Sequence, residues 1–200
     1  MAAPIAFYID FSSPYGYFAA SAIDGLAAEY GRAVAWKPIV LGPIMKETGN
    51  RPLVEQGAKG AYALRDWQRL GRLMDVPWVL PEPFPIAAVA AARAFWWLDD
   101  RDAALARRFA RAAYAAYFAK GVNITPIATV AAIAASVGAD GPAVEAALQD
   151  PAVKDRLRAE TAAAMAAGVC GSPFFIADGE PFWGADRLPM LRRWLEVGHW

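Results

Sequence analysis

The chain has almost none of the two side chains on which much enzyme chemistry depends. Its 200 residues include one cysteine, Cys170, and one histidine, His199. A single cysteine excludes an intramolecular disulfide, and one Cys with one His cannot complete a Cys/His zinc site. A Ser-His-Asp triad would have to use the penultimate residue, and chain ends are usually frayed. We therefore expect chemistry that needs neither a metal nor an internal disulfide.

The sequence also lacks a charge imbalance and a long apolar run. Lys+Arg and Asp+Glu each number 20, which gives a formal net charge of +0, so no basic surplus indicates a nucleic-acid partner. Charges such as Arg93, Arg107 and Arg111 interrupt the apolar stretches, so none is expected to span a membrane. Residues 1–4 show no feature of a signal peptide. We expect a soluble, cytoplasmic protein.

Hydrophobic residues make up 57% of the chain, which is ample material for a core. The run Ile5–Ile9 is short, apolar and β-prone, so it predicts a buried strand. Pro14 is expected to open a helix that ends near Tyr30 before Gly31, and residues 34–40 predict a second strand. A β-α-β start favours a parallel pair of strands with a right-handed crossover.

The middle of the sequence has a different pattern. Between residues 43 and 150, Ala, Leu, Arg and aromatic residues recur at helical spacing, and no segment predicts a strand. We expect four or five helices there. Thr125-Pro126 and Asp150-Pro151 each resemble a helix N-cap followed by proline at the first helical position.

The carboxyl-terminal part returns to mixed structure. A helix from Pro151 to about residue 167 is followed by predicted strands at 174–177 and 181–183, which a turn would join into a hairpin. A last helix is expected from Asp186. Together with the β-α-β start, this predicts an α/β, thioredoxin-like fold with a large all-helical insertion.

The same pattern predicts the domain boundaries. Residues 1–42 and 151–200 would form a discontinuous thioredoxin-like domain. Residues 43–150 would form the inserted helical domain.

Ser13 is the first candidate for chemistry, because it lies where the first strand meets the first helix. With Pro14 at the next position, it would cap the helix, and capping alone explains a serine there. A helix start also favours anions such as a thiolate, and a serine hydroxyl can donate a hydrogen bond that lowers a thiol pKa. Since Cys170 is distant and no C-x-x-C motif occurs, the thiol would come from a small molecule, with glutathione the obvious one.

Two further segments are candidates. Ser172-Pro173 precedes a strand, and in a thioredoxin-like fold this loop holds a cis proline whose preceding residue offers its backbone to an extended peptide. A proline that simply opens a strand is the alternative. Asp186 would either cap the last helix or bind the α-amino end of a γ-glutamyl group.

Four motifs in order along the chain resemble those of one enzyme family. They are Asp10 with Ser13-Pro14-Tyr15, Gly49-Asn50-Arg51-Pro52, Gly171-Ser172-Pro173, and Gly184-Ala185-Asp186-Arg187. The sequence is similar to the 2-hydroxychromene-2-carboxylate isomerase family, close kin of the kappa-class glutathione transferases. The motifs span nearly the whole chain. Two departures are Ala87-Ala88, where relatives often have Asn-Thr, and Ala185, where many have a polar residue.

The resemblance implies a role for each of these positions. Ser13 would activate the glutathione sulfur, and Ser172 with Pro173 would pair with the cysteinyl backbone. Other implied glutathione contacts are Asn50, Lys59, Ala185, Asp186 and Arg187. Asn50 as a turn residue and Lys59 as a solvated lysine are the alternatives.

The implied reaction is glutathione-dependent isomerisation of 2-hydroxychromene-2-carboxylate-type aromatic acids by reversible thiolate addition, in a homodimer. A kappa-like transferase and a non-catalytic binding module remain alternatives. A disulfide oxidoreductase is not expected, because Ser13 and Gly16 occupy the places of the two redox cysteines. Cys170 would be a small buried residue or a reactive thiol.

The aromatic residues are also open to two interpretations. They would form the core, or some would line an apolar pocket for a flat aromatic substrate. The candidates are Trp36, Tyr62, Trp67, Trp78, Phe84 and Trp183.

Overall fold

The computed structural model describes residues 3–199; Met1, Ala2 and Trp200, which the predicted domain ranges include, lie outside it. Four strands form one sheet: β1 (Ile5–Ile9), β2 (Val34–Pro38), β3 (Phe174–Ala177) and β4 (Glu180–Trp183). The α-helices are α1 (Pro14–Glu29), α2 (Leu41–Thr48), α3 (Ala58–Leu73), α4 (Val89–Asp99), α5 (Ala103–Tyr114), α6 (Ile127–Ser136), α7 (Gly141–Ala147), α8 (Pro151–Ala166) and α9 (Leu188–Val197). Two 3₁₀ turns, η1 (Leu53–Glu55) and η3 (Ala185–Arg187), and a π-helical turn, η2 (Ala115–Ala119), complete the elements.

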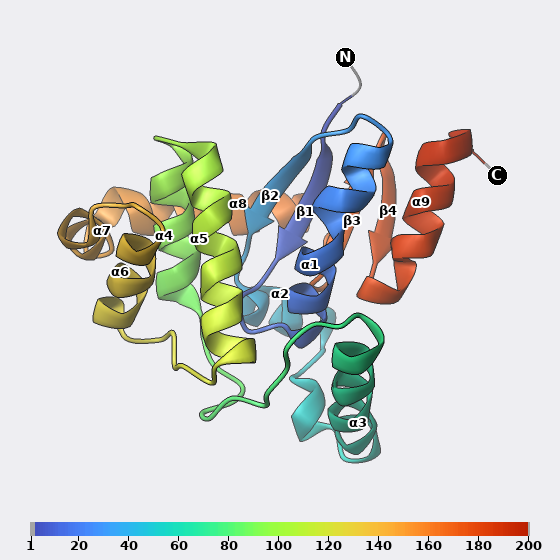
Figure 1. Ribbon diagram of the computed structural model, residues 1–200, viewed down its shortest axis with the longest axis horizontal. Coiled ribbons are helices and arrows are strands. Elements are labelled where there is room, and N and C mark those ends of the chain that lie inside the picture. The colour runs from blue at the N-terminus through green and yellow to red at the C-terminus, as the bar shows by residue number, and fades with distance from the viewer. Residues whose placement is uncertain (1–2, 200) are drawn as a thin grey trace.

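The sheet has the strand order β2-β1-β3-β4 (Figure 1). Strand β1 pairs in parallel with β2, from Ile5 opposite Val34 to Ile9 opposite Pro38, and β3 pairs antiparallel with both β1 and β4. The predicted β-α-β start and β-β-α end are therefore both present, and the α/β class is confirmed. The division of the chain into two domains stays a prediction.

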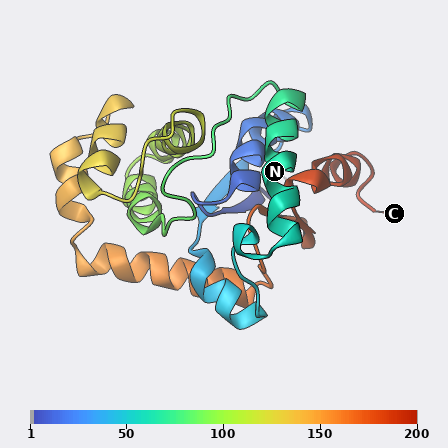
Figure 2. The same cartoon turned by 90° about the horizontal axis from the view of Figure 1, so that it is seen from below.

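Helices cover both faces of the sheet. Seen from below, α1 and α3 lie on one side and α2 and α8 on the other (Figure 2). Helices α4 to α7 lie beyond the β2 edge (Figure 1). All these helices except α1 lie between β2 and β3 in the sequence. The long connection between these two strands therefore wraps around the β2 edge of the sheet and around the end at which β1 leads into α1.

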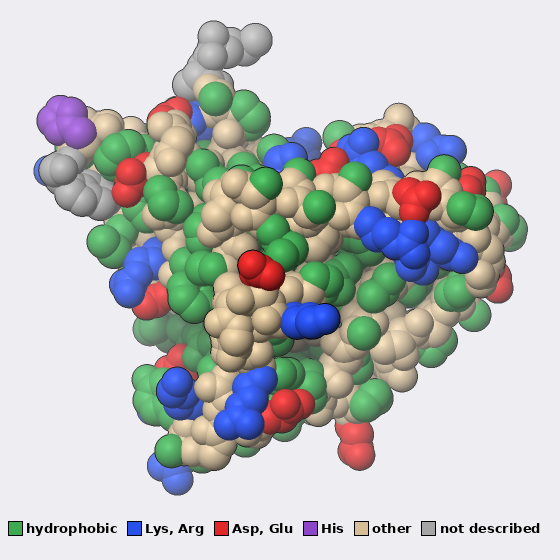
Figure 3. Space-filling view, turned by 180° about the vertical axis from the view of Figure 1, so that it is seen from behind, with side chains coloured by type: hydrophobic (Ala, Val, Ile, Leu, Met, Phe, Trp, Pro, Cys, Tyr) green, Lys and Arg blue, Asp and Glu red, His purple; other side chains and the backbone are tan. Residues whose placement is uncertain are grey.

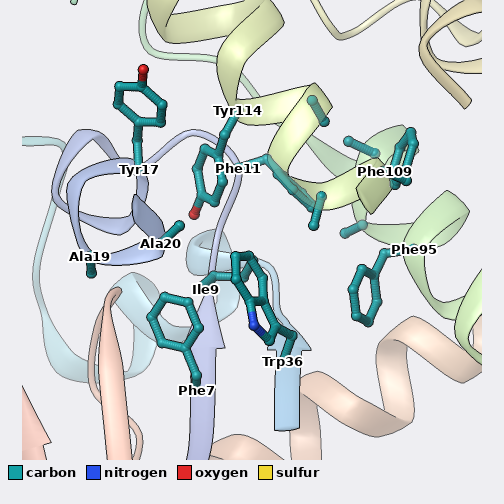
Figure 4. Packing of buried hydrophobic residues seen from close by; sticks show 14 of the residues in the cluster. Phe7, Ile9, Phe11, Tyr17, Ala19, Ala20, Trp36, Phe95, Phe109 and Tyr114 are labelled. Carbon is teal, nitrogen blue, oxygen red and sulfur yellow. The ribbon is translucent and has the colours of Figure 1, made fainter. Parts of the chain in front are cut away.

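Aromatic side chains join the sheet to the helices. The Phe7 ring stacks on Phe175 and meets Trp36 edge-on, with both centroid distances 5.0 Å. Phe11 and Tyr114 meet at 5.0 Å. Figure 4 shows the Tyr114 ring reaching from α5 toward α1 and the end of β1. Because each fully buried side chain of this size contributes roughly 1.5–3 kcal/mol, this packing holds α5 firmly against the sheet.

Some predicted helix boundaries need correction. Five α-helices, α3 to α7, begin within residues 43–150, in agreement with the expected four or five, and α2 begins just before this range at Leu41. Asp150 caps α8 as predicted, with its carboxylate accepting from the Ala152 N–H at 2.8 Å. The Thr125-Pro126 prediction was wrong by one position: Pro126 is the N-cap residue of α6, while the Thr125 hydroxyl bonds Asn123. The N–H and the hydroxyl of Thr125 both donate to the Asn123 side chain, so Thr125 belongs to a local turn that precedes the helix.

The outer surface mixes charges of both signs. Figure 3, which views the side of α2 and α8, shows basic side chains next to acidic ones. On α8, for example, Arg156 pairs with Glu160 and Arg158 with Asp155. No helix within residues 3–199 is long and apolar enough to cross a membrane.

Candidate functional site

Ser13 lies at the start of α1 as the sequence predicts. Its backbone is extended, and its hydroxyl oxygen accepts a hydrogen bond from the Gly16 N–H at 3.1 Å, so it caps the helix. The same hydroxyl donates to the Ser172 carbonyl oxygen at 2.8 Å. Only 6% of Ser13 is exposed. The cap thus also links two segments that are 159 residues apart in sequence.

The Ser172-Pro173 loop forms the opposite side of the site. The Ser172–Pro173 peptide bond is cis, which decides between the two interpretations that the sequence left open. The Ser172 hydroxyl accepts from the Asp10 N–H at 2.8 Å, and the Pro173 carbonyl accepts from the Gly184 N–H at 3.0 Å. Hydrogen bonds therefore tie the cis-proline loop to the end of β1 on one side and to η3 on the other.

The Asp10 carboxylate holds a second turn in place. One oxygen accepts from the Ser12 N–H at 2.8 Å and the Ser12 hydroxyl at 2.7 Å, and the other accepts from the Leu41 N–H at 2.8 Å. Burial raises the pKa of this carboxyl, against the hydrogen bonds from Ser12 and Leu41, which lower it. The carboxylate joins the β1–α1 turn to the start of α2. Asp10 was part of a motif in the sequence, but nothing in that motif indicated that its carboxylate would join these two segments.

Tyr114 is a member of the site that sequence reasoning missed. Its hydroxyl donates to the Asp10 carbonyl at 2.9 Å, and the residue is 1% exposed. A Cβ on Gly16 would lie 2.5 Å from this hydroxyl. No side chain of any kind fits at position 16 without movement, so the second redox-cysteine position is filled by the tyrosine. One Tyr in an alanine-rich helix, 98 residues away, carries no local signal.

Two backbone donors at the site have no acceptor within residues 3–199. Pro14 has no N–H, and the N–H groups of Gly16 and Tyr17 bond to Ser13. The Tyr15 N–H is therefore the open donor of the first turn of α1. The Ser172 N–H is likewise open. Together with the Ser13 hydroxyl, these groups suit an anion or an extended peptide backbone.

Helix α3 closes one flank of the site. The Tyr15 hydroxyl donates to Asp66 on α3 at 2.9 Å, and the Tyr15 ring meets Trp67 edge-on at 6.0 Å. Burial, followed by the bond to Asp66 and the charges of Asp66 and Asp186, raises the pKa of the Tyr15 phenol far above its ordinary value. The hydrogen bond to Asp66 and the ring contact with Trp67 thus hold Tyr15 against α3.

The predicted contacts at Asn50 and Lys59 lie on the surface. The Asn50 side-chain oxygen (Oδ1) accepts from the Arg51 backbone N–H at 2.9 Å and from the Gln56 side-chain amide at 3.2 Å, as a turn residue does. Lys59 is exposed in the first turn of α3. Neither residue bonds to Ser13 or Ser172, and their roles in binding stay predictions.

The last predicted group lies in η3. Of the two interpretations of Asp186, that it caps the final helix was wrong: α9 begins at Leu188, and the N-cap residue is Arg187, with no side-chain cap bond. The Asp186 carboxylate is 74% exposed and faces Arg187 at 3.4 Å. The cause is the inserted 3₁₀ turn, which displaces Asp186 by one position from the cap. Ala185 is half-buried, and the binding roles of all three residues stay predictions.

Cys170 borders this loop, but it is a poor nucleophile. The residue is half-buried against an apolar cluster that includes Val169 and Phe174. Burial raises the pKa of its thiol, which disfavours the thiolate. This agrees with the interpretation of Cys170 as a small packing residue.

The aromatic residues that the sequence offered as core or pocket residues differ in how deeply they are buried. Trp36 and Trp67 belong to the core, whereas Tyr62 and Trp183 are 60% and 52% exposed. Trp183 packs so close to Gly171 that a Cβ there would meet its indole nitrogen at 2.3 Å. Trp78 lines a cavity of about 700 Å³ that also includes Leu64, Gln68 and Arg72. Because these α3 residues lie away from the Asp66 side of the helix, the cavity is separate from the Ser13 site.

Comparison with known proteins agrees with this geometry. The DSBA-like thioredoxin domain matches residues 4–196. The chain belongs to this family. In this member of the family, the start of α1 at Ser13 is hydrogen-bonded to the cis-proline loop.

Individual proteins that are similar to this chain make the comparison more specific than the family match. A 2-hydroxychromene-2-carboxylate isomerase of Sphingobium xenophagum is 28% identical over 200 residues, covering 98% of this chain and 99% of the relative. A glutathione S-transferase kappa 1 of Caenorhabditis elegans is 27% identical, covering 69% of this chain and 64% of the relative. A solved 2-hydroxychromene-2-carboxylate isomerase superimposes with a TM-score of 0.88 at 27% identity, covering 96% and 94% of the two chains.

Proposed function

We propose that the protein is a glutathione-dependent isomerase of 2-hydroxychromene-2-carboxylate-type aromatic acids, which it interconverts with trans-o-hydroxybenzylidenepyruvates. The observation that carries the proposal is the Ser13 hydroxyl, held at the start of α1 and 2.8 Å from the carbonyl of the cis-proline loop. The isomerases that match nearly the full chain support it. Glutathione dependence rests on the site itself and on the kappa-class relatives.

The open donors fit a small thiol peptide. The Ser13 hydroxyl and the Tyr15 N–H lie at a helix start, where a thiolate is favoured, and the Ser172 N–H suits a peptide carbonyl. In this proposal, Asn50 and Lys59 bind the glycine end. Ala185, Asp186 and Arg187 hold the γ-glutamyl end, where the Asp186 carboxylate is opposite in charge to the ligand's ammonium group and the Arg187 guanidinium is opposite in charge to its carboxylate.

Ser13 acts by hydrogen bonding. Its hydroxyl rotates from the Ser172 carbonyl to the ligand sulfur and keeps accepting from the Gly16 N–H, which polarises the O–H bond. A charge-assisted bond to sulfur lowers the thiol pKa. When bound, glutathione supplies a sulfur nucleophile that adds reversibly to a double-bond carbon of the substrate, which permits rotation about that bond. The chain orients the glutathione and stabilises the negative charge on its sulfur.

The test is product analysis with dialysed protein. We expect interconversion of the two substrate isomers only when glutathione is added, with no glutathione consumed, and at least a hundredfold less activity for Ser13→Ala. A stoichiometric glutathione conjugate would instead identify the transferase alternative, which the kappa-class match favours. Glutathione-independent turnover would contradict the proposal.

The homodimer and the cytoplasmic location are parts of the same proposal. The sedimentation velocity of the purified chain, whose mass is 21.5 kDa, distinguishes a monomer from a dimer. Fractionation of the source cells tests the location.

A further inference from the structure

A second cavity lies at the opposite end of the sheet from Ser13. It is an open pocket of about 360 Å³ between α1, the start of β2 and the exposed flank of α5, and Val34 lines it. Val34 pairs with Ile5 at the first position of β1, whereas Ser13 follows Ile9 at the other end. Figure 1 shows the elements of this cavity side by side, above the turn that leads into α1. The two sites are therefore separate.

The wall of this cavity is strongly cationic. Four arginines, Arg32, Arg107, Arg108 and Arg111, line it together with one carboxylate, Asp24. The whole chain has a net charge of +0 and only 20 Lys and Arg residues. A fifth of its cationic side chains thus surround one small cavity, which general basicity does not explain.

Internal ion pairs neutralise only two of these arginines. Arg111 pairs with Asp24 at 2.6 Å, and Asp24 also accepts from the Trp36 indole at 3.2 Å. Arg32 forms a two-pronged bond to Asp178, with both distances 2.9 Å. These two guanidiniums are fixed in place.

Arg107 and Arg108 form no ion pair within 4.0 Å among residues 3–199, and the only carboxylate on which the charge of Arg107 is seen to act there is the more distant Asp99. Arg107 and Arg108 are consecutive residues of α5, and Arg111 lies about one helical turn after Arg107. Like charges four residues apart destabilise a helix, so this arrangement carries a cost in the empty protein. A bound anion would offset that cost and use the two open guanidinium forks.

We propose that this arginine cavity binds a small molecule carrying a diphosphate group. Guanidinium forks match phosphate oxygens in pairs, and two open arginines beside two fixed ones match the two to three negative charges of a diphosphate. The cavity volume of about 360 Å³ lies at the lower end of small-ligand sites and exceeds the need of a single phosphate. The site does not depend on the function proposed for Ser13.

The experiment is titration of the full chain with inorganic pyrophosphate by calorimetry at a fixed ionic strength of about 0.15 M, at which surface charges are screened. We expect saturable binding at one site, weakened at least tenfold in Arg107→Gln and in Arg108→Gln. Arg158→Gln, which removes an exposed arginine of α8, is the matched control and should bind as the wild type does. Ser13→Ala should also bind pyrophosphate normally, which separates this proposal from the isomerase.

Three results would overturn the inference. The first is no saturable binding up to millimolar pyrophosphate. The second is equal weakening in Arg158→Gln, since that would show general charge attraction. The third is citrate binding as tightly as pyrophosphate, since that would replace the diphosphate with a polycarboxylate. A thermal-shift series checks that each variant is folded.

Discussion

The starts of α1 and α9 both face the candidate site, but they are built in different ways. At α1, Ser13 caps the helix, is 6% exposed and bonds across to the cis-proline loop. At α9, the cap residue Arg187 makes no side-chain cap bond, and the Asp186 carboxylate is 74% exposed. The fold thus fixes the first helix start through hydrogen bonds within the chain, whereas the polar groups at the second are exposed and make no cap bond.

This difference has a consequence for catalysis. Groups that must stabilise developing charge act best when they are already in place, because no reorganisation is needed during reaction. Exposed groups contribute to binding, and solvent screening reduces the free energy that each of them contributes. We therefore expect changes near Ser13 to affect the rate and changes near Asp186 to affect the affinity.

The largest effect is expected from Ser13→Ala. Loss of one preorganised donor typically costs roughly 100- to 1,000-fold in rate, so kcat/KM for isomerisation should fall by about that factor. The same change removes a helix cap, worth about 0.5–2 kcal/mol of stability. Asp150→Ala is the matched control, since it removes the cap of α8 far from the site. If Asp150→Ala lost as much activity, the role of Ser13 would be structural.

Asp10→Asn is expected to destabilise the fold by about 1–3 kcal/mol, because an amide nitrogen would face a backbone or hydroxyl donor. The effect should depend on pH. Burial raises the folded-state pKa of Asp10 above its unfolded value, so the contribution of this carboxyl is full below the unfolded pKa and declines as pH rises through the folded one. The variant lacks this titration.

The measurement for Asp10 is denaturant unfolding of both proteins between about pH 4 and pH 8. The gap in free energy of unfolding should be larger at the acid end and narrower near neutrality. A gap that widened with pH would show a folded-state pKa below the unfolded one.

Gly16→Ala tests the close approach of Tyr114. A Cβ at position 16 would lie 2.5 Å from the Tyr114 hydroxyl, so we expect a loss of about 1–3 kcal/mol in the free energy of unfolding. The loss should be smaller in a Tyr114→Phe background, because the clashing oxygen is gone. Equal losses in both backgrounds, in a double-mutant cycle, would mean that the two residues do not interact.

The smallest effect is expected at the second helix start. Asp186→Asn should raise KM for glutathione roughly fivefold, equivalent to about 1 kcal/mol, and leave kcat nearly unchanged. Glu145→Gln, an exposed carboxylate on α7, is the control. A drop in kcat with unchanged KM would place Asp186 among the groups that act on the rate.

Features set by local sequence were predictable, and features set by tertiary contacts were not. Strand β1, helix α1 and the Ser13 cap follow from short runs of residues with strong preferences. The extra 3₁₀ turn that moves Asp186 off the cap depends on how β4 leads into α9. Tyr114 reaches the site only because α5 packs against the end of β1, and no residue close to Tyr114 in the sequence indicates that contact.

The most direct test of the central claim is the pKa of the glutathione thiol when it is bound. Ultraviolet absorbance of the thiolate, recorded across pH at saturating protein, gives this value for the wild type and for Ser13→Ala. We predict a pKa well below the ordinary cysteine value of about 8.5 in the wild type, and a return toward that value in the variant. The same thiol pKa in both proteins would contradict the account, because the Ser13 hydroxyl would then contribute nothing to the thiolate.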